Sequence, residues 1–176
     1  MKNQYFADRN DFYKYDLLLE LAEGLNLRKV VVGAMLTPND RRGDGGFTSY
    51  ECGDRREVLY ALLRDCLRRG SRSLTELPGL FQKLGTECVL VSDAVWPGDR
   101  EAYFAQFTPD LLRHSVAFLD PDNGLEAKSA RGRKHVRYTE VRQVFLNLPG
   151  DGLLVVYQHL PRECQCRLKT DPSAPK

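Results

Sequence analysis

The sequence predicts an α/β fold: a three-layer sandwich with a Rossmann-like, mostly parallel sheet. Four short runs are apolar along their whole length, and segments with helical periodicity lie between them: 29–36, 86–93, 115–120 and 152–160. A strand that is apolar on both faces must be covered by helices on both sides, which is typical of parallel sheets. The chain of 176 residues fits one domain, expected over 1–162, followed by a polar tail at 163–176.

The first helix is expected over residues 10–24 because apolar side chains recur there at helical spacing. Asn10 can cap its start and Gly24 can end it. The stripe consists of Phe12, Tyr15, Leu18, Leu19 and Ala22. The β-branched run 29–36 is the first strand. A loop should follow over 37–46, since Pro38 and three glycines disfavour a continued strand.

Two helices are expected before the second strand. Residues 54–70 form an amphipathic pattern with arginines near the C-terminal end, where positive charge suits the helix dipole. Residues 73–85 also favour a helix, with an interruption at Pro78. The apolar run 86–93 is the second strand.

The remaining elements alternate in the same way. Helices are expected over 97–107 and 108–114, the second with Thr108 as its cap and Pro109 at the first helical position. The third strand covers 115–120. A helix over 138–148 and a fourth strand over 152–160 complete the pattern.

Composition favours a soluble cytoplasmic protein with no membrane partner. The polar N-terminus is unlike a signal peptide, and no apolar run approaches the roughly 20 residues that cross a bilayer. The five cysteines form no paired set of metal-binding spacings, and their odd number favours reduced thiols. No metal site is therefore predicted. The sequence leaves the oligomeric state open.

Overall charge identifies no partner, because 26 lysines and arginines face 24 acids. One segment, 128–137, is locally basic and contains no acid: its cations are Lys128, Arg131, Arg133, Lys134 and Arg137. Such a segment is usually a solvated loop, and a phosphate-bearing partner such as nucleic acid is the more specific hypothesis.

In parallel sheets, ligands bind beyond the carboxyl ends of the strands. That rule selects four loops that also hold much of the polar chemistry: 37–46, 92–99, 120–126 and 158–163. The third loop, DPDNGLE, contains Asp120, Pro121, Asp122 and Asn123. Pro121 fixes the backbone and Asn123-Gly124 favours a turn, so the loop is either a simple strand end or a rigid catalytic rim. In the second case a carboxylate there would orient an amine.

Further candidates lie outside that loop. Asp11 and Lys14 share a helix face with Tyr15, either as an exposed ion pair or as ligands at the sheet rim. Asp44 and Asp93 follow predicted strands, where acids can bind cofactor hydroxyl or amino groups or only support a turn. His159, after the last strand, is a possible acid or base or a core residue. Trp96 is expected at the core edge or as a stacking residue.

Three blocks of the sequence carry a resemblance: KNQYFADRNDFYKYDLL, DPDNGLE and YQHLPR. With them, nearly the whole chain resembles a family of uncharacterised bacterial proteins. More distantly it resembles the bacterial ribosomal RNA adenine-N6 methyltransferases of the J type. That resemblance implies an S-adenosylmethionine cofactor near Asp11 and Lys14 and a target amine oriented by the loop at Asp120. The pattern differs where Asp122 replaces a second proline and where the glycine-rich Asp44-Gly45-Gly46 comes late.

Two other functions are compatible with the sequence. Asp120, Asp122, Glu126 and Lys128 resemble the acidic pattern of metal-dependent nucleases, although Asp122 and Glu126 are close together in the chain. Alternatively, the protein is a non-catalytic nucleotide- or nucleic-acid-binding module. The three hypotheses differ in whether the protein binds S-adenosylmethionine, magnesium or neither.

Overall fold

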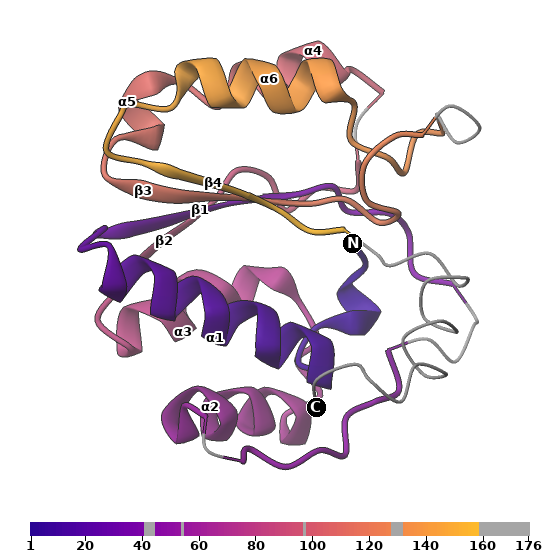
Figure 1. Ribbon diagram of the computed structural model, residues 1–176. Coiled ribbons are helices and arrows are strands. Elements are labelled where there is room, and N and C mark those ends of the chain that lie inside the picture. The colour runs from indigo at the N-terminus through magenta and orange to yellow at the C-terminus, as the bar shows by residue number, and fades with distance from the viewer. Residues whose placement is uncertain (41–44, 54, 97, 128–131, 159–176) are drawn as a thin grey trace, which may run out of the picture.

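The computed structural model describes residues 1–40, 45–53, 55–96, 98–127 and 132–158. A parallel four-stranded sheet lies between two layers of helices, as the sequence predicts (Figure 1). The strands are β1 (Lys29–Ala34), β2 (Glu87–Leu90), β3 (Ser115–Asp120) and β4 (Leu153–Val156). The helices are α1 (Arg9–Gly24), α2 (Glu57–Arg68), α3 (Leu77–Lys83), α4 (Arg100–Ala105), α5 (Pro109–Leu112) and α6 (Tyr138–Asn147), with short 3₁₀ turns at Asn3–Tyr5 and Leu74–Glu76.

The strand order is β2-β1-β3-β4, with β1 and β3 at the centre. Their register runs from Lys29 beside Ser115 to Ala34 beside Asp120. From β1 the chain first continues to β2 on one side, and it later enters β3 on the other side. The carboxyl ends of β1 and β3 therefore form the topological switch point, where doubly wound sheets open a crevice for ligands.

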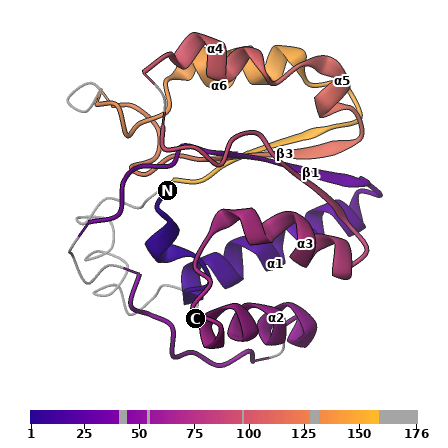
Figure 2. The same cartoon turned by 180° about the vertical axis from the view of Figure 1, so that it is seen from behind.

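Each face of the sheet has its own hydrophobic core. One core joins the sheet to α1, α2 and α3, and the other joins it to α4, α5 and α6; Figure 2 shows both layers from behind. Trp96 belongs to the second core, is 7% exposed and packs edge-on against Tyr103. The expectation that Trp96 closes a core edge is confirmed. Among the described residues, no helix is long and apolar enough to cross a bilayer.

Two expectations about the helices are wrong for local chemical reasons: the cap of the first helix and the interruption at Pro78. Asp8, not Asn10, caps α1, because its side chain accepts the backbone N–H of Asp11 at 2.9 Å. Pro78 does not interrupt a helix; it occupies the first turn of α3, where its missing N–H has no intrahelical partner to lose. Thr108 caps α5 as predicted.

The third predicted strand, 115–120, is confirmed as β3, whereas the other three predicted strands run too far at their carboxyl ends. β1 ends at Ala34 although Met35 and Leu36 are also apolar, and β4 ends at Val156. The last two residues of the fourth predicted strand, 159–160, lie outside the described residues. Composition alone cannot mark these ends, because a strand ends where its hydrogen bonding to the neighbouring strand stops and not where the apolar residues stop. The residues beyond them become the rim of the sheet.

Gly33 is a glycine that the central strand requires. A Cβ there would lie 2.6 Å from the Phe107 ring and 2.9 Å from Leu119. We expect Gly33→Ala to lower the free energy of unfolding by about 1–3 kcal/mol through overpacking. Gly79→Ala, on α3 with open space around it, should raise the same quantity by up to about 1 kcal/mol. Urea denaturation measures both; equal effects of the two substitutions would contradict the packing described.

Candidate functional site

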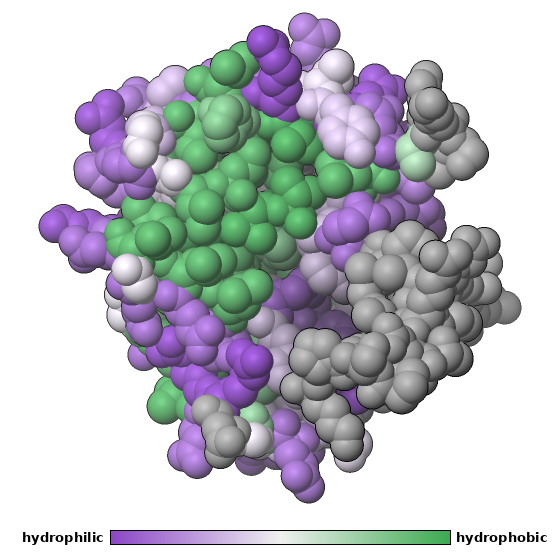
Figure 3. Space-filling model, in the orientation of Figure 1, coloured by the Kyte–Doolittle hydropathy of each residue, from purple (hydrophilic) through white to green (hydrophobic). Residues whose placement is uncertain are grey.

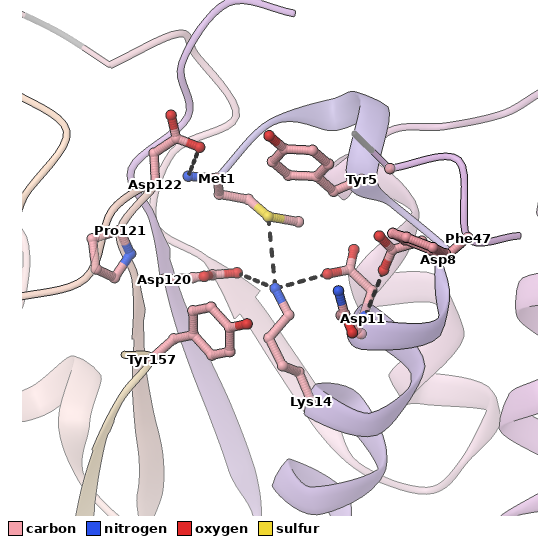
Figure 4. Close-up of a pocket in the computed structure, with 12 residues that line it drawn as sticks. Met1, Tyr5, Asp8, Asp11, Lys14, Phe47, Asp120, Pro121, Asp122 and Tyr157 are labelled. Carbon is pink, nitrogen blue, oxygen red and sulfur yellow. Dashed lines mark hydrogen bonds and ion pairs between the residues drawn. The ribbon is translucent and has the colours of Figure 1, made fainter. Parts of the chain in front are cut away.

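A cavity of about 270 Å³ lies at the switch point of the sheet. Its walls come from parts of the chain that are distant in sequence: the N-terminal segment, α1, the loop after β1, the loop after β3 and the end of β4 (Figure 4). The lining residues are Met1, Tyr5, Asp8, Asn10, Asp11, Lys14, Gly45, Phe47, Asp120, Pro121, Asp122 and Tyr157. Acidic and aromatic side chains dominate this wall.

Lys14 lies between two buried carboxylates at the bottom of the site. Its Nζ is 2.7 Å from Asp11 Oδ1 and 2.8 Å from Asp120 Oδ2. It also lies 4.8 Å from the centre of the Tyr157 ring, a cation–π distance. These contacts fasten α1 to the ends of β3 and β4 (Figure 4).

The protonation of this cluster follows from burial and pairing. Burial raises the pKa of Asp11 to about 6, even though the Lys14 ammonium counteracts it. Burial lowers the pKa of Lys14, but the carboxylates of Asp11 and Asp120 outweigh this effect, so the pKa of Lys14 lies above its ordinary value. The pKa of the Asp8 carboxyl is raised by burial. At neutral pH Lys14 is therefore a fixed cation and is not a general base.

Asp122 anchors the loop that follows β3. Its carboxylate lies 3.4 Å from the α-amine of Met1 and 3.1 Å from Lys134 Nζ, and it accepts the Thr37 hydroxyl at 3.0 Å. Burial opposes its ionisation, but the amine, Lys134 and Thr37 together lower the pKa of Asp122. The ionised Asp122 side chain therefore holds its loop in place and also lines the cavity.

The basic segment is fastened to the same loop. The backbone N–H of Asn123 donates to Lys134 at 3.0 Å, and that of Val136 donates to Gly124 at 3.0 Å. Arg100 holds the segment from the other side by donating to the carbonyl of His135 at 2.9 Å while it pairs with Glu140. The described cations Arg133, Lys134 and Arg137 therefore have a fixed backbone beside the cavity and exposed side chains.

The structure brings together five of the residues that the sequence singled out. Asp11, Lys14, Asp120, Pro121 and Asp122 all line the cavity. The expectation of an exposed Asp11–Lys14 pair is wrong, because the pair is buried. Lys14 does lie at the sheet rim, where its ammonium is paired with Asp11 and Asp120.

Other predicted residues lie elsewhere. Asp93 is exposed and absent from the cavity wall, because β2 lies on the other side of β1 from the switch point. Asn123 is exposed and does not line the cavity. Glu126 accepts the backbone N–H of Tyr138 at 3.0 Å and so supports the start of α6. Asp44, Lys128, Arg131, His159 and the tail 163–176 lie outside the described residues.

Sequence reasoning missed several lining residues. Tyr157 directly follows β4, so the strand-end rule could have identified it. Asp8 precedes the helix and carries a cap signal. Met1, Tyr5 and Phe47 carry no local signal, since only the tertiary fold brings them to the cavity. Gly45, at φ +85°, passes so close to Tyr5 that a Cβ would lie 2.7 Å from its ring.

Comparison with protein families, with curated proteins and with solved structures finds no match to this chain. Within the described residues, no group of three or more histidine, cysteine, aspartate or glutamate side chains is arranged to hold a metal ion. Cys52, Cys66 and Cys88 are free thiols.

The raised pKa of Asp11 predicts a specific pH dependence of stability. The folded state holds this proton up to about pH 6, whereas the ordinary pKa is 3.8, so the contribution of Asp11 falls as pH rises between these values. We expect Asp11→Asn to remove this contribution. The free energy of unfolding, measured by urea denaturation at pH 4 and pH 6, should fall less with pH in the variant, by up to about 1.4 kcal/mol per pH unit. Identical slopes would contradict the assignment.

The Lys14 ion pairs should contribute strongly to stability. Lys14→Met leaves two buried carboxylates without their cation, and we expect a loss of about 3–5 kcal/mol in the free energy of unfolding. Lys83→Met, at an exposed position of α3, should change it by less than about 0.5 kcal/mol. Denaturation at pH 7 measures both variants. A Lys14→Met protein as stable as the Lys83→Met protein would show that the cluster does not hold α1 in place.

Proposed function

We propose that the protein is an S-adenosylmethionine-dependent methyltransferase that acts on an amino nitrogen. The observation that carries the proposal is the acidic, aromatic cavity at the switch point, with Asp120 and Pro121 at its rim. Ligands of doubly wound sheets bind at this place. The composition of the wall favours a ligand that is positively charged or rich in N–H donors.

The charges of the wall fit such a ligand. Four carboxylates line the cavity, those of Asp8, Asp11, Asp120 and Asp122, against two amines, those of Lys14 and the Met1 α-amine. Tyr5, Phe47 and Tyr157 add aromatic faces, which attract organic cations and stack on flat rings. When bound, S-adenosylmethionine supplies an electrophilic methyl group on a cationic sulfur. Its ammonium and sulfonium suit the acids, and its adenine suits the aromatic rings.

The cavity volume limits how much of the cofactor it encloses. About 270 Å³ is close to the lower end of the range for small-molecule sites. We therefore expect this cavity to hold one end of the cofactor. The remainder would extend along the loop after β1, of which Gly45 and Phe47 form the described part of the wall.

Asp120 is the residue proposed to orient the acceptor. Lys14 occupies one lone pair of Asp120 Oδ2. A carboxylate has about four acceptor positions, so Asp120 can also accept hydrogen bonds from the N–H groups of a substrate amine. Pro121 has no N–H and restricts the backbone next to it. Lys14 fixes the Asp120 side chain in turn. The expected gain is orientation of the amine lone pair, with no proton held by a strong base.

Nucleic acid is the acceptor that the surroundings favour. Arg133, Lys134 and Arg137 are exposed on a segment whose backbone is bonded to the loop after β3, and Lys134 also pairs with Asp122 of that loop. Cations at this place would contact the phosphates on either side of a base that enters the cavity. The nuclease alternative receives less support, because Glu126 is engaged at the start of α6.

Calorimetric titration with S-adenosylmethionine tests the proposal. We expect binding to the unchanged protein, and Asp120→Asn should abolish methyl transfer to an adenine-containing oligonucleotide while its circular dichroism spectrum stays unchanged. Asp93→Asn is the matched control, because this acid also follows a strand but lies outside the cavity wall. S-adenosylmethionine binding and methyl transfer should both persist in this variant. Oligonucleotide affinity should fall steeply with added salt.

Other outcomes would exclude the proposal. Absence of binding to S-adenosylmethionine, together with magnesium binding that Asp120→Asn removes, would favour the nuclease hypothesis. Oligonucleotide binding without either small ligand would identify a non-catalytic binding module.

A further inference from the structure

β4 is an outer strand of the described sheet, and no other described strand pairs with its outer edge. Among the described residues it pairs with β3 alone. The N–H of Tyr157 donates to Leu119 of β3 at 2.9 Å. Since successive N–H groups of a strand point to alternate sides, those of Leu154 and Val156 point away from β3. The outer edge of β4 therefore presents backbone donors and acceptors that a further strand can pair with.

The surface around this edge is apolar. Residues 152–157, GLLVVY, contain no charged side chain, and Leu153 to Val156 are all partly exposed. Figure 3 shows a continuous hydrophobic area on the face where α6, β4 and α1 lie in Figure 1. On the α1 side, Leu17 is 47% exposed. Edge strands of stable monomers usually carry charges, prolines or bulges that prevent pairing, and this one has none of them.

Phe145 extends the area on α6. Its side chain is 61% exposed. Glu140 and Asn147 bond to Arg100 and to the Phe107 carbonyl, so their side of α6 faces α4. At about 100° per residue, Phe145 lies about 140° around the helix from Glu140 and about 160° from Asn147, on the side away from α4. We define the edge patch as Leu17, β4 and Phe145.

We propose that the edge patch is the interface of a two-fold symmetric dimer, in which β4 of one copy pairs antiparallel with β4 of a second copy. A two-fold axis brings the same patch of both chains together and closes both edges in one contact. A charge-free patch is compatible with its own copy, whereas a charged one would repel it. Residues 159–176, which follow β4, carry six charged side chains and no apolar run, so this segment does not match the patch.

Size-exclusion chromatography with light scattering tests the dimer. The unchanged chain should elute at twice its 20.1 kDa mass. Phe145→Asp, which places a charge in the patch without touching the core, should raise the dissociation constant by about a hundredfold or more. Val58→Asp, an equally exposed position on α2, should leave it unchanged. Figure 1 shows α2 on the side of α1 that faces away from the sheet.

A second variant tests strand pairing separately from hydrophobic contact. Val156→Pro removes an N–H that points outward, so the pairing with β3 and the circular dichroism spectrum should persist while the dimer dissociates. A protein that elutes as a monomer of 20.1 kDa overturns the proposal. An assembly whose mass keeps growing beyond two chains as the protein concentration rises also overturns it. A dimer that both Phe145→Asp and Val156→Pro leave intact would place the interface elsewhere. None of these readouts depends on methyl transfer.

Discussion

The position of α1 over the sheet edge depends on one buried interaction, the Lys14 ammonium between Asp11 and Asp120. All three side chains are close to fully buried, so loss of the shared cation would leave two carboxylates buried without a partner. The cluster fixes where along its axis the helix meets β3. That position in turn places Asp8, Asn10 and the N-terminal segment around the cavity. A hydrophobic contact could hold the helix equally well, but it would not set this register.

The loop after β3 is held from two directions, which explains how an irregular segment can be rigid. Asp122 binds cations and the Thr37 hydroxyl on the cavity side. On the other side the loop is bonded to the basic segment, and Arg100 with Glu140 fastens that segment to α4 and α6. The helical layer on each face of the sheet therefore contributes to a single rim. This arrangement lets a site of acids and aromatic rings keep its shape before any ligand enters.

The inner strands of the sheet and the outer strand β4 differ in how they are covered. The inner strands β1 and β3 are covered on both faces and end at the cavity. Tyr157, which follows the outer strand β4, lines the cavity, while the edge of β4 away from β3 pairs with no described strand. Pairing of that edge with a second copy would thus occur one strand away from the proposed catalytic centre. A rigid β4 would hold both Tyr157 in the cavity wall and the proposed dimer interface in place.

The sequence by itself determined the elements and the sheet rim, because apolar runs and helical periodicity are local properties of the chain. It also indicated Asp120 and Asp122, since acids after a buried strand must lie at that rim. The tertiary structure alone decided which rim residues meet. Asp93 has the same local context as Asp120, yet the strand order places it across β1 from the switch point. Phe47 and Tyr5 reach the cavity only through contacts between distant segments, and no spacing in a single sequence encodes those contacts.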